Sequence, residues 1–252
     1  MRFDGSVVVV TGGSLGIGEA TARRFAREGA RVVIASRDAR NAAKAVKAIA
    51  DAGCEAAHIP SDLARDDDVA ALAKEVQQRF GRVNVLVNNA AIHMQGDAET
   101  TTPADWDRVM AVNLRGAFLC THHFIADLAV QRGVIVNVSS EAGLVGIKGQ
   151  VAYNVSKAGL IALTRSCAVD FAAKGIRVNC VCPGTTSTPL VDAIVTRAED
   201  PAALQRQLES IRPLDRLGTA DEIASAIVFL ASDEAAYATG AILSVDGGYT
   251  AQ

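Results

Sequence analysis

Short apolar runs alternate with longer segments of helical periodicity along the whole chain. Most runs are continuously apolar and rich in β-branched residues, which is typical of parallel strands covered on both faces. We expect strands at Val7–Val10, Arg31–Ala35, Ala56–Ile59, Val83–Val87, Val134–Val138, Arg177–Val181 and Ala241–Val245. The helical segments between them are Ile17–Glu28, Asn41–Ala52, Asp67–Phe80, Ala104–Ala129, Val151–Lys174 and Asp221–Ala231. This repeated βα order predicts an α/β fold with a doubly wound sheet and right-handed crossovers.

One stretch, residues 185–217, departs from this pattern. It is more polar, contains Pro189, Pro201 and Pro213, and has no clear strand. Ligands of α/β sheets bind beyond the carboxyl ends of the strands. Because this stretch follows the sixth strand, we expect it to close over a ligand as a substrate lid. No linker or repeat divides the chain, so we expect a single domain over residues 1–252.

Composition and charge exclude several classes of function. The net charge is −3 and no basic stripe is present, which argues against a nucleic-acid partner. The N-terminus leads into the first strand without the apolar region of a signal peptide, and no apolar run approaches about 18 residues. We therefore expect no membrane partner and a cytoplasmic protein.

The cysteines support the same compartment. Their number is odd and no pair has zinc spacing, so we expect buried thiols in a reducing environment, with metal or redox work as the alternative. Cys180 and Cys182 are two residues apart on a predicted strand and should face the same side of the sheet. We expect no metal.

A glycine-rich turn follows the first strand directly and opens the first helix. Glycines allow a tight turn and let backbone N–H groups approach a pyrophosphate at the positive end of the helix. The spacing differs from G-x-G-x-x-G, so an ordinary strand-to-helix turn is the alternative. The candidate dinucleotide-binding residues here are Gly12, Ser14, Leu15, Gly16, Ile17 and Gly18.

The end of the second strand bears on the choice of cofactor. NAD sites usually place an acidic residue here for the adenosine ribose, but this chain has Ser36 followed by Arg37. Serine and guanidinium can bind a 2′-phosphate through charge-assisted hydrogen bonds, which favours NADP. In the alternative, Arg37 is a solvated surface residue and Asp38 binds the ribose of NAD.

Two further strand ends carry candidate cofactor contacts. Asp62 and Leu63 follow the third strand, where they are placed to contact the adenine. Asn89, Ala90 and Ala91 follow the fourth strand and would line the cleft. Each of these stretches, taken singly, is more often an Asx turn than a site.

Tyr153 and Lys157 form the strongest chemical signal, with Ser140 thirteen residues before the tyrosine. On a helix, residues four apart share a face, so the ammonium would lie beside the phenol. A cation about 4 Å away at an effective dielectric near 20 favours the phenolate by roughly 4 kcal/mol, which would bring the pKa of the phenol from about 10 to near 7. A general acid or base works best there. The alternative is an exposed helical pair of little energetic weight.

Taken together, these features resemble the short-chain dehydrogenase/reductase family over essentially the whole chain. The resemblance rests on Thr11–Gly18, Asp62, Asn88–Ala91, Asn113, Ser140, Tyr153, Lys157, Pro183, Gly184 and Thr188. It implies one Rossmann-type domain with a seven-stranded parallel sheet, helices on both faces and an NAD(P) cofactor.

The resemblance also implies a role for each catalytic candidate. Tyr153 would exchange a proton with the substrate oxygen, and Lys157 would bond the nicotinamide ribose and lower the pKa of the phenol. Ser140, rather than Ser139, matches the serine that orients the substrate oxygen. Asn113 would hold a water that links Lys157 to solvent.

The chain departs from the family pattern at two cofactor positions. Ala91 stands where the family usually has glycine, a small change that should leave the cleft intact. After Pro183 and Gly184 the family tends to place Val or Ile against the nicotinamide, but Thr186 stands here. Thr188 remains available for the carboxamide.

These residues imply an oxidoreductase that interconverts a secondary alcohol and a ketone by hydride transfer. The alternatives are an NAD-dependent alcohol or diol dehydrogenase and a non-catalytic dinucleotide-binding sensor. An intact Asn–Ser–Tyr–Lys set argues against the sensor, which would not need a tuned phenol.

The substrate itself is less well indicated. Candidate substrate loops are His93–Gly96, Glu141–Gln150 and residues 185–217. Polar residues there suggest a sugar or a hydroxylated ring unless they simply face solvent, and a 3-oxoacyl substrate is a further option.

The two longest helical segments contain more small and apolar residues than one sheet face requires. The family resemblance suggests that these segments, Ala104–Ala129 and Val151–Lys174, form an interface in a homotetramer. The region Val245–Tyr249 would form a second contact.

Overall fold

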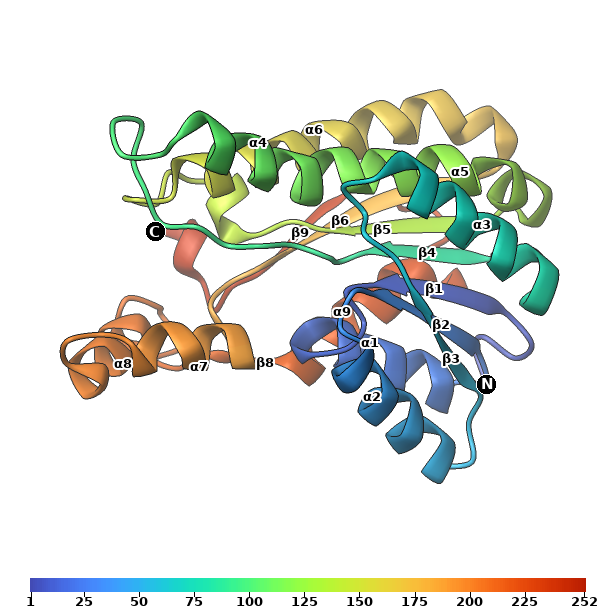
Figure 1. The fold of residues 1–252 in the computed structure, drawn as a ribbon, viewed down its shortest axis with the longest axis horizontal. Helices are drawn as coiled ribbons and strands as arrows, with labels where there is room; N and C mark the ends of the chain where they lie inside the picture. Colours follow the sequence, from blue (N-terminus) through green and yellow to red (C-terminus); the bar gives the residue numbers. More distant parts are fainter.

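All seven predicted strands lie in one parallel sheet in the computed structural model, which describes residues 1–252 (Figure 1). In sheet order they are β3 (Ala56–Pro60), β2 (Arg31–Ser36), β1 (Val7–Thr11), β4 (Val85–Asn88), β5 (Val134–Val138), β6 (Arg177–Pro183) and β9 (Ile242–Val245). Val8 pairs with Val32 of β2 on one side and with Val85 of β4 on the other. The order of the strands therefore reverses between β1 and β4, which is the switch point where such sheets bind ligands.

Helices cover both faces of the sheet, as expected. On one face lie α1 (Gly16–Arg27), α2 (Ala39–Asp51) and α9 (Ala220–Ala231), and on the other α3 (Asp66–Phe80), α4 (Pro103–Met110), α5 (Gly116–Gln131) and α6 (Val151–Phe171). Alternate residues of β1 enter separate cores, because Val8 and Val10 pack in one cluster and Val7 and Val9 in the other. This explains why the predicted strands are apolar at every position rather than at every second one.

The segment predicted as one helix over Ala104–Ala129 is interrupted. Between α4 and α5 the backbone forms a π-helical turn, Ala111–Arg115, whose buried residue is Asn113. Gly116 follows it, and a Cβ there would lie 3.0 Å from the Cβ of Leu63. The π-helical turn thus contains the buried Asn113 and ends where the backbone packs closely against Leu63. Single π-helical turns of this kind are common at functional sites.

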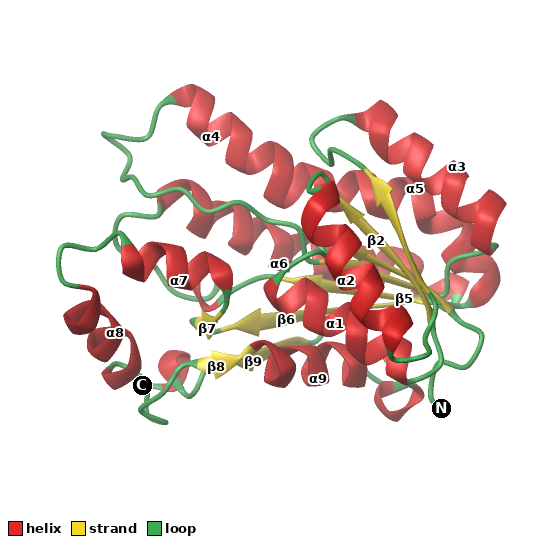
Figure 2. Ribbon diagram, turned by 60° about the horizontal axis from the view of Figure 1, so that its bottom comes forward, coloured by secondary structure: helices red, strands yellow, loops and turns green.

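The expectation of no strand in residues 185–217 is wrong. Thr186–Ser187 forms β7, which pairs in parallel with β8 (Gly218–Thr219) in a separate two-stranded sheet. The helices α7 (Pro189–Thr196) and α8 (Pro201–Ser210) lie between them. Two of the prolines that suggested irregular structure stand in the first turn of a helix, where the missing N–H costs nothing. Both helices lie beyond the carboxyl ends of β6 and β9 (Figure 2).

Cys180 and Cys182 confirm the expected strand geometry, since their Sγ atoms lie 3.9 Å apart on one side of the sheet. All five cysteines are free thiols, and only Cys54 is not buried. No helix is both long enough and apolar enough to cross a lipid bilayer.

Candidate active site

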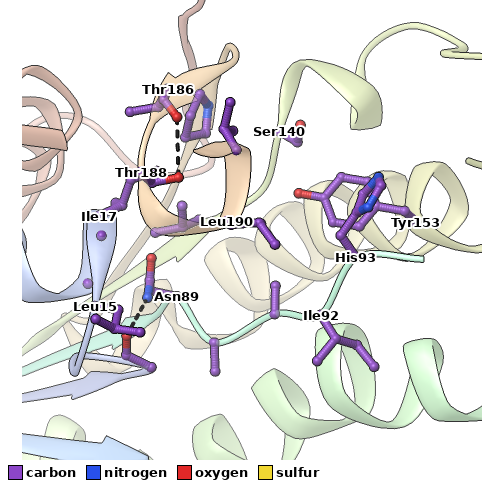
Figure 3. Close-up of a pocket in the computed structure, with 18 of the residues that line it drawn as sticks. Leu15, Ile17, Asn89, Ile92, His93, Ser140, Tyr153, Thr186, Thr188 and Leu190 are labelled. Carbon is purple, nitrogen blue, oxygen red and sulfur yellow. Dashed lines mark hydrogen bonds between the residues drawn. The ribbon is translucent and has the colours of Figure 1, made fainter. Parts of the chain in front are cut away.

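A cavity of about 860 Å³ lies at the carboxyl ends of the strands. It runs from the glycine turn after β1 to the N-terminal end of α6 and is bordered by α7 and α8. Figure 3 shows Leu15 and Ile17 near one end of it, with Ser140, His93 and Tyr153 gathered at the other. Apart from Asn113, every residue predicted from the sequence to act in catalysis or cofactor binding lines this cavity.

The glycine turn is built for a ligand that approaches the backbone closely. Gly12 has φ +63°, and a Cβ there would lie 2.8 Å from the Cα of Ala90. A Cβ on Gly18 would lie 2.2 Å from the carbonyl oxygen of Gly12. No side chain caps the N-terminus of α1, which begins at Gly16. Its first backbone N–H groups thus have no side-chain partner, and the donor set fits a dinucleotide pyrophosphate.

Asn89 fixes the glycine turn to the end of β4. Its Nδ2 donates to the carbonyl oxygens of Thr11 at 3.0 Å and of Gly12 at 3.2 Å. The hydroxyl of Thr11 accepts from the backbone N–H groups of Asn89 and Ala90. Ala90 and Ala91 follow on the cavity wall. Asn89 is therefore engaged in building the wall of the cleft.

The three residues at the end of β2, Ser36, Arg37 and Asp38, all line the cavity, and Asp38 also caps a helix. The Asp38 carboxylate accepts from the backbone N–H of Asn41 at 3.0 Å and from its Nδ2 at 2.6 Å, so it caps α2. These bonds lower the pKa of Asp38. Ser36 lies 3.3 Å from His58 Nε2, and the exposed guanidinium of Arg37 lies 3.9 Å from the Asp62 carboxylate. Asp62 and Leu63 also line the cavity.

Tyr153 and Lys157 share one face of α6, as the spacing predicts. Lys157 Nζ lies 5.6 Å from the centre of the Tyr153 ring, and the side chain is nearly inaccessible to solvent. Nζ donates to the carbonyl oxygen of Val138 at 2.8 Å. Burial lowers the pKa of Lys157 to about 8.

The predicted fall in the pKa of Tyr153 toward 7 is wrong for the protein alone. Burial of the phenol raises its pKa to about 12; the Ser140 hydroxyl acts in the opposite direction, and the charge of Glu141 adds to the rise. The phenol loses more by leaving water than it gains from the Ser140 hydroxyl.

The two adjacent serines have different surroundings. Ser139 is buried, and its Oγ donates to the carbonyl oxygen of Lys157 at 2.8 Å. Ser140 is the more exposed of the two, and its Oγ accepts from the backbone N–H of Ala142 at 3.1 Å. The Ser140 hydroxyl therefore keeps its hydrogen for the phenol, a contact that lowers the pKa of Tyr153. The sequence distance that selected Ser140 agrees with this placement.

Asn113 lies behind the cavity wall. Its Nδ2 donates to the carbonyl oxygen of Ile92 at 2.9 Å and to Ser156 Oγ at 3.1 Å, while its Oδ1 accepts from the backbone N–H of Ile92 at 2.8 Å. Both amide hydrogens are thus used within the protein. The side chain holds the loop after β4 against α6, so it positions the segment that carries His93.

The predicted nicotinamide end follows β6. Thr186 is buried, and its hydroxyl donates to the carbonyl oxygen of Gly184 at 2.8 Å. Thr188 donates to the carbonyl oxygen of Thr186 at 3.2 Å (Figure 3). Pro183 and Gly184 line the same wall. The threonine that departs from the family pattern therefore satisfies its hydroxyl locally and starts the short strand β7.

Sequence reasoning missed one buried pair at the substrate end. Arg212, from the turn after α8, lies 2.7 Å from the Glu141 carboxylate, and both side chains are buried. The sequence places Glu141 in a predicted substrate loop but does not predict an ion pair between Glu141 and Arg212. The two residues are far apart in the sequence, so no local pattern indicates that they pair.

His93 belongs to another of the predicted substrate loops. Its ring lies edge-on to Tyr153 with ring centres 5.1 Å apart, and burial lowers the pKa of His93.

Comparison with known proteins identifies the family. The family model described as "Enoyl-(Acyl carrier protein) reductase" matches residues 12–250. The chain belongs to the short-chain dehydrogenase/reductase family. An uncharacterised oxidoreductase of Thermotoga maritima is 46% identical over 100% of both chains. A cis-4-hydroxycyclohexanecarboxylate dehydrogenase of Sinomonas cyclohexanicum is 44% identical, covering 99% of this chain and 98% of the relative.

A solved structure of levodione reductase agrees, with a TM-score of 0.96 at 34% identity over 99% of both chains. The named relatives show that this short-chain dehydrogenase/reductase is an oxidoreductase that acts on CH–OH groups. Membership of the family implies a nicotinamide dinucleotide cofactor, and the glycine turn fits one.

Proposed function

We propose that the protein interconverts a secondary alcohol and a ketone, with Tyr153 as the general acid and base and NADP(H) as the preferred cofactor. The nicotinamide supplies or accepts the hydride. The observation that carries the proposal is the meeting of Tyr153 and Ser140 at one end of a cavity whose other end is the glycine turn.

The protonation states suit a proton donor. A phenol whose pKa is raised to about 12 is protonated at neutral pH, so Tyr153 can donate to an oxygen that gains charge during reduction. Ser140 donates a hydrogen bond to the same oxygen. Lys157 is mostly protonated at pH 7, because burial leaves its pKa at about 8, and its charge favours the phenolate that forms. Asn113 acts behind them by holding Ile92, and a water between it and Lys157 would complete the proton path.

The adenosine end supports NADP over NAD. Asp38 also lines the cavity, but its carboxylate already accepts two hydrogen bonds from Asn41 as the cap of α2. Ser36 and Arg37 line the cavity, where the carboxylates of Asp38 and Asp62 are the charges that oppose a phosphate dianion. The Arg37 guanidinium is exposed and can turn from Asp62 to a 2′-phosphate, which it would bind by paired charge-assisted hydrogen bonds.

The wall beside Tyr153 favours a substrate with an apolar body. The lining includes the aliphatic side chains Ile147, Leu190, Ile194, Leu208 and Ile211, with His93, Gln95, Gln150 and Arg197 among its polar members. A hydroxylated or oxo-substituted ring fits this lining better than a sugar. A relative named for a hydroxycyclohexane acid agrees with a ring. A 3-oxoacyl chain is the second candidate, because the same aliphatic residues would accept it.

We also propose a homotetramer. The solvent-facing side of α5 carries Phe118 and Val130, and that of α6 carries Val155 and Val169, all exposed. Four exposed apolar side chains on two helices of the same sheet face support a contact with another subunit, and Val169 among them is 79% exposed.

Cofactor absorbance at 340 nm tests the proposed reaction. Purified protein with NADPH or NADH is assayed against cyclohexanone, acetoin and ethyl acetoacetate, alongside Tyr153→Phe. We expect the variant to bind NADPH as the parent does and to lose at least about 100-fold in kcat, the range of general acid catalysis. Near-normal turnover by the variant would refute the assignment of Tyr153. Cofactor binding without turnover of any alcohol or ketone by the parent would favour the sensor.

A further inference from the structure

The buried pair of Glu141 and Arg212 joins four parts of the chain. Arg212 Nη2 lies 2.7 Å from Glu141 Oε1 and donates to Thr185 Oγ1 at 2.5 Å. Nη1 donates to the carbonyl oxygen of Leu208, and the guanidinium lies 5.2 Å from the centre of the Tyr249 ring. One side chain thus connects the loops that follow β5 and β6, the helix α8 and the segment after β9.

All of these parts border the substrate end of the cavity. Glu141 is the residue after Ser140, and both belong to the turn in which Ser140 Oγ accepts from Ala142 N–H. The packing around Glu141 is tight, because a Cβ on Gly184 would lie 2.9 Å from Glu141 Oε2. A displacement of the Glu141 carboxylate is therefore transmitted to the Ser140 turn on one side and to the loop after β6 on the other.

The pair is poorly explained by stability alone. The side chains of Arg212 and Glu141 are only 2% and 6% exposed, and Glu141 Oε2 and Arg212 Nε have no hydrogen-bond partner. Burial raises the pKa of Glu141, and the charge of Arg212 acts against this rise. Two apolar residues of similar volume are often at least as stable as a buried ion pair. What an apolar pair lacks is the fixed direction of the guanidinium bonds.

We propose that Glu141 and Arg212 are positioning residues that hold the Ser140 turn and the α7–α8 segment (Pro189–Ser210) in the arrangement that closes the substrate end. Neither residue touches the reacting atoms. The inference rests on the proposed roles of Ser140 and Tyr153. It adds that the Glu141–Arg212 pair sets the position of Ser140 relative to the α7–α8 segment.

A double apolar variant separates positioning from stability. Glu141→Leu/Arg212→Met leaves no unpaired buried charge and can fold where either single variant does not. Arg216→Met is the matched control, because Arg216 is four residues away and its ion pair with Glu222 is exposed and outside the cavity. Four measurements are made: the melting temperature, the NADPH affinity, amide hydrogen exchange of residues 189–210 with NADPH bound, and the steady-state kinetics (kcat and KM) of the best substrate of the carbonyl panel.

We expect the double variant to melt no lower than the parent and to bind NADPH equally well. Its kcat/KM should fall about 100-fold, mainly through kcat, as for a misplacement of about 1 Å at a reacting centre. Residues 189–210 should exchange faster, and Arg216→Met should match the parent in all four measurements.

Parental exchange and parental kcat/KM in the double variant would show that the pair is only structural and overturn the proposal. Tyr153→Phe keeps the two questions apart, since it should be inactive with parental exchange in residues 189–210. If Tyr153→Phe is active, the proposed catalytic role fails, while the exchange measurement still decides the role of the pair.

Discussion

The buried ammonium of Lys157 should lower the free energy of unfolding of the protein. The side chain is 2% exposed, and burial brings its pKa from 10.5 to about 8. Each pKa unit corresponds to about 1.4 kcal/mol, so the charged form costs about 3 kcal/mol at pH 7. Methionine fills a similar volume without a charge, and loses a charge-assisted hydrogen bond to Val138 worth about 1.5 kcal/mol. We expect Lys157→Met to raise the free energy of unfolding by about 1.5 kcal/mol and the melting temperature by about 3–6 °C.

The pH dependence gives this prediction a second check. The folded pKa of Lys157 lies below its unfolded value, so the unfolded chain binds more protons between about pH 8 and 10.5. The free-energy cost of burying the charged Lys157 is fully present below pH 8 and disappears as the pH rises from about 8 to 10.5. The advantage of Lys157→Met should therefore shrink from pH 7 to pH 10.

The assay is urea and thermal unfolding of the cofactor-free protein at both pH values, with the exposed Lys44→Met as the control. A variant less stable than the parent at pH 7, or an advantage that is unchanged at pH 10, would refute the reasoning. The same variant should be inactive, because the proposed mechanism needs the cation beside the phenol.

Two further outcomes follow from the proposed function. Arg37→Met should lower kcat/KM with NADPH by about 10- to 100-fold, the strength of a charge-assisted hydrogen bond, and leave NADH unchanged; equal losses with both cofactors would contradict a 2′-phosphate contact. Light scattering at micromolar concentration should give four times the mass of the chain, and Val169→Asp on the exposed face of α6 should reduce it; a monomer mass for the parent would contradict the tetramer.

The sequence alone was sufficient for the main sheet. A strand covered on both faces has to be apolar at nearly every position, so the strands of a doubly wound sheet stand out from helices whose apolar residues recur every three or four positions. Each predicted strand agrees with the structure to within two residues at either end. The glycine turn and the shared face of Cys180 and Cys182 were equally local properties, and both were predicted correctly.

The short elements after β6 could not be read in the same way. The strands β7 and β8 contain two residues each, too few for a periodic pattern. Pro189 and Pro201 suggested irregular structure, although each stands in the first turn of a helix. Their role depends on whether a helix forms around them, and that is decided by the packing of the segment over the cavity.

Tertiary structure also decided the electrostatics of the site. The spacing of Tyr153 and Lys157 correctly placed a cation beside a phenol. Whether the pKa of the phenol rises or falls depends on how far the surrounding residues exclude water from it. The pairing of Glu141 with Arg212 depends on two loops that meet only after the sheet has formed. The periodicity of apolar residues shows which face of a segment is buried, because a buried position requires an apolar residue at that point in the sequence. The balance between desolvation and charge is set by atoms from many segments, so it exists only in the folded chain.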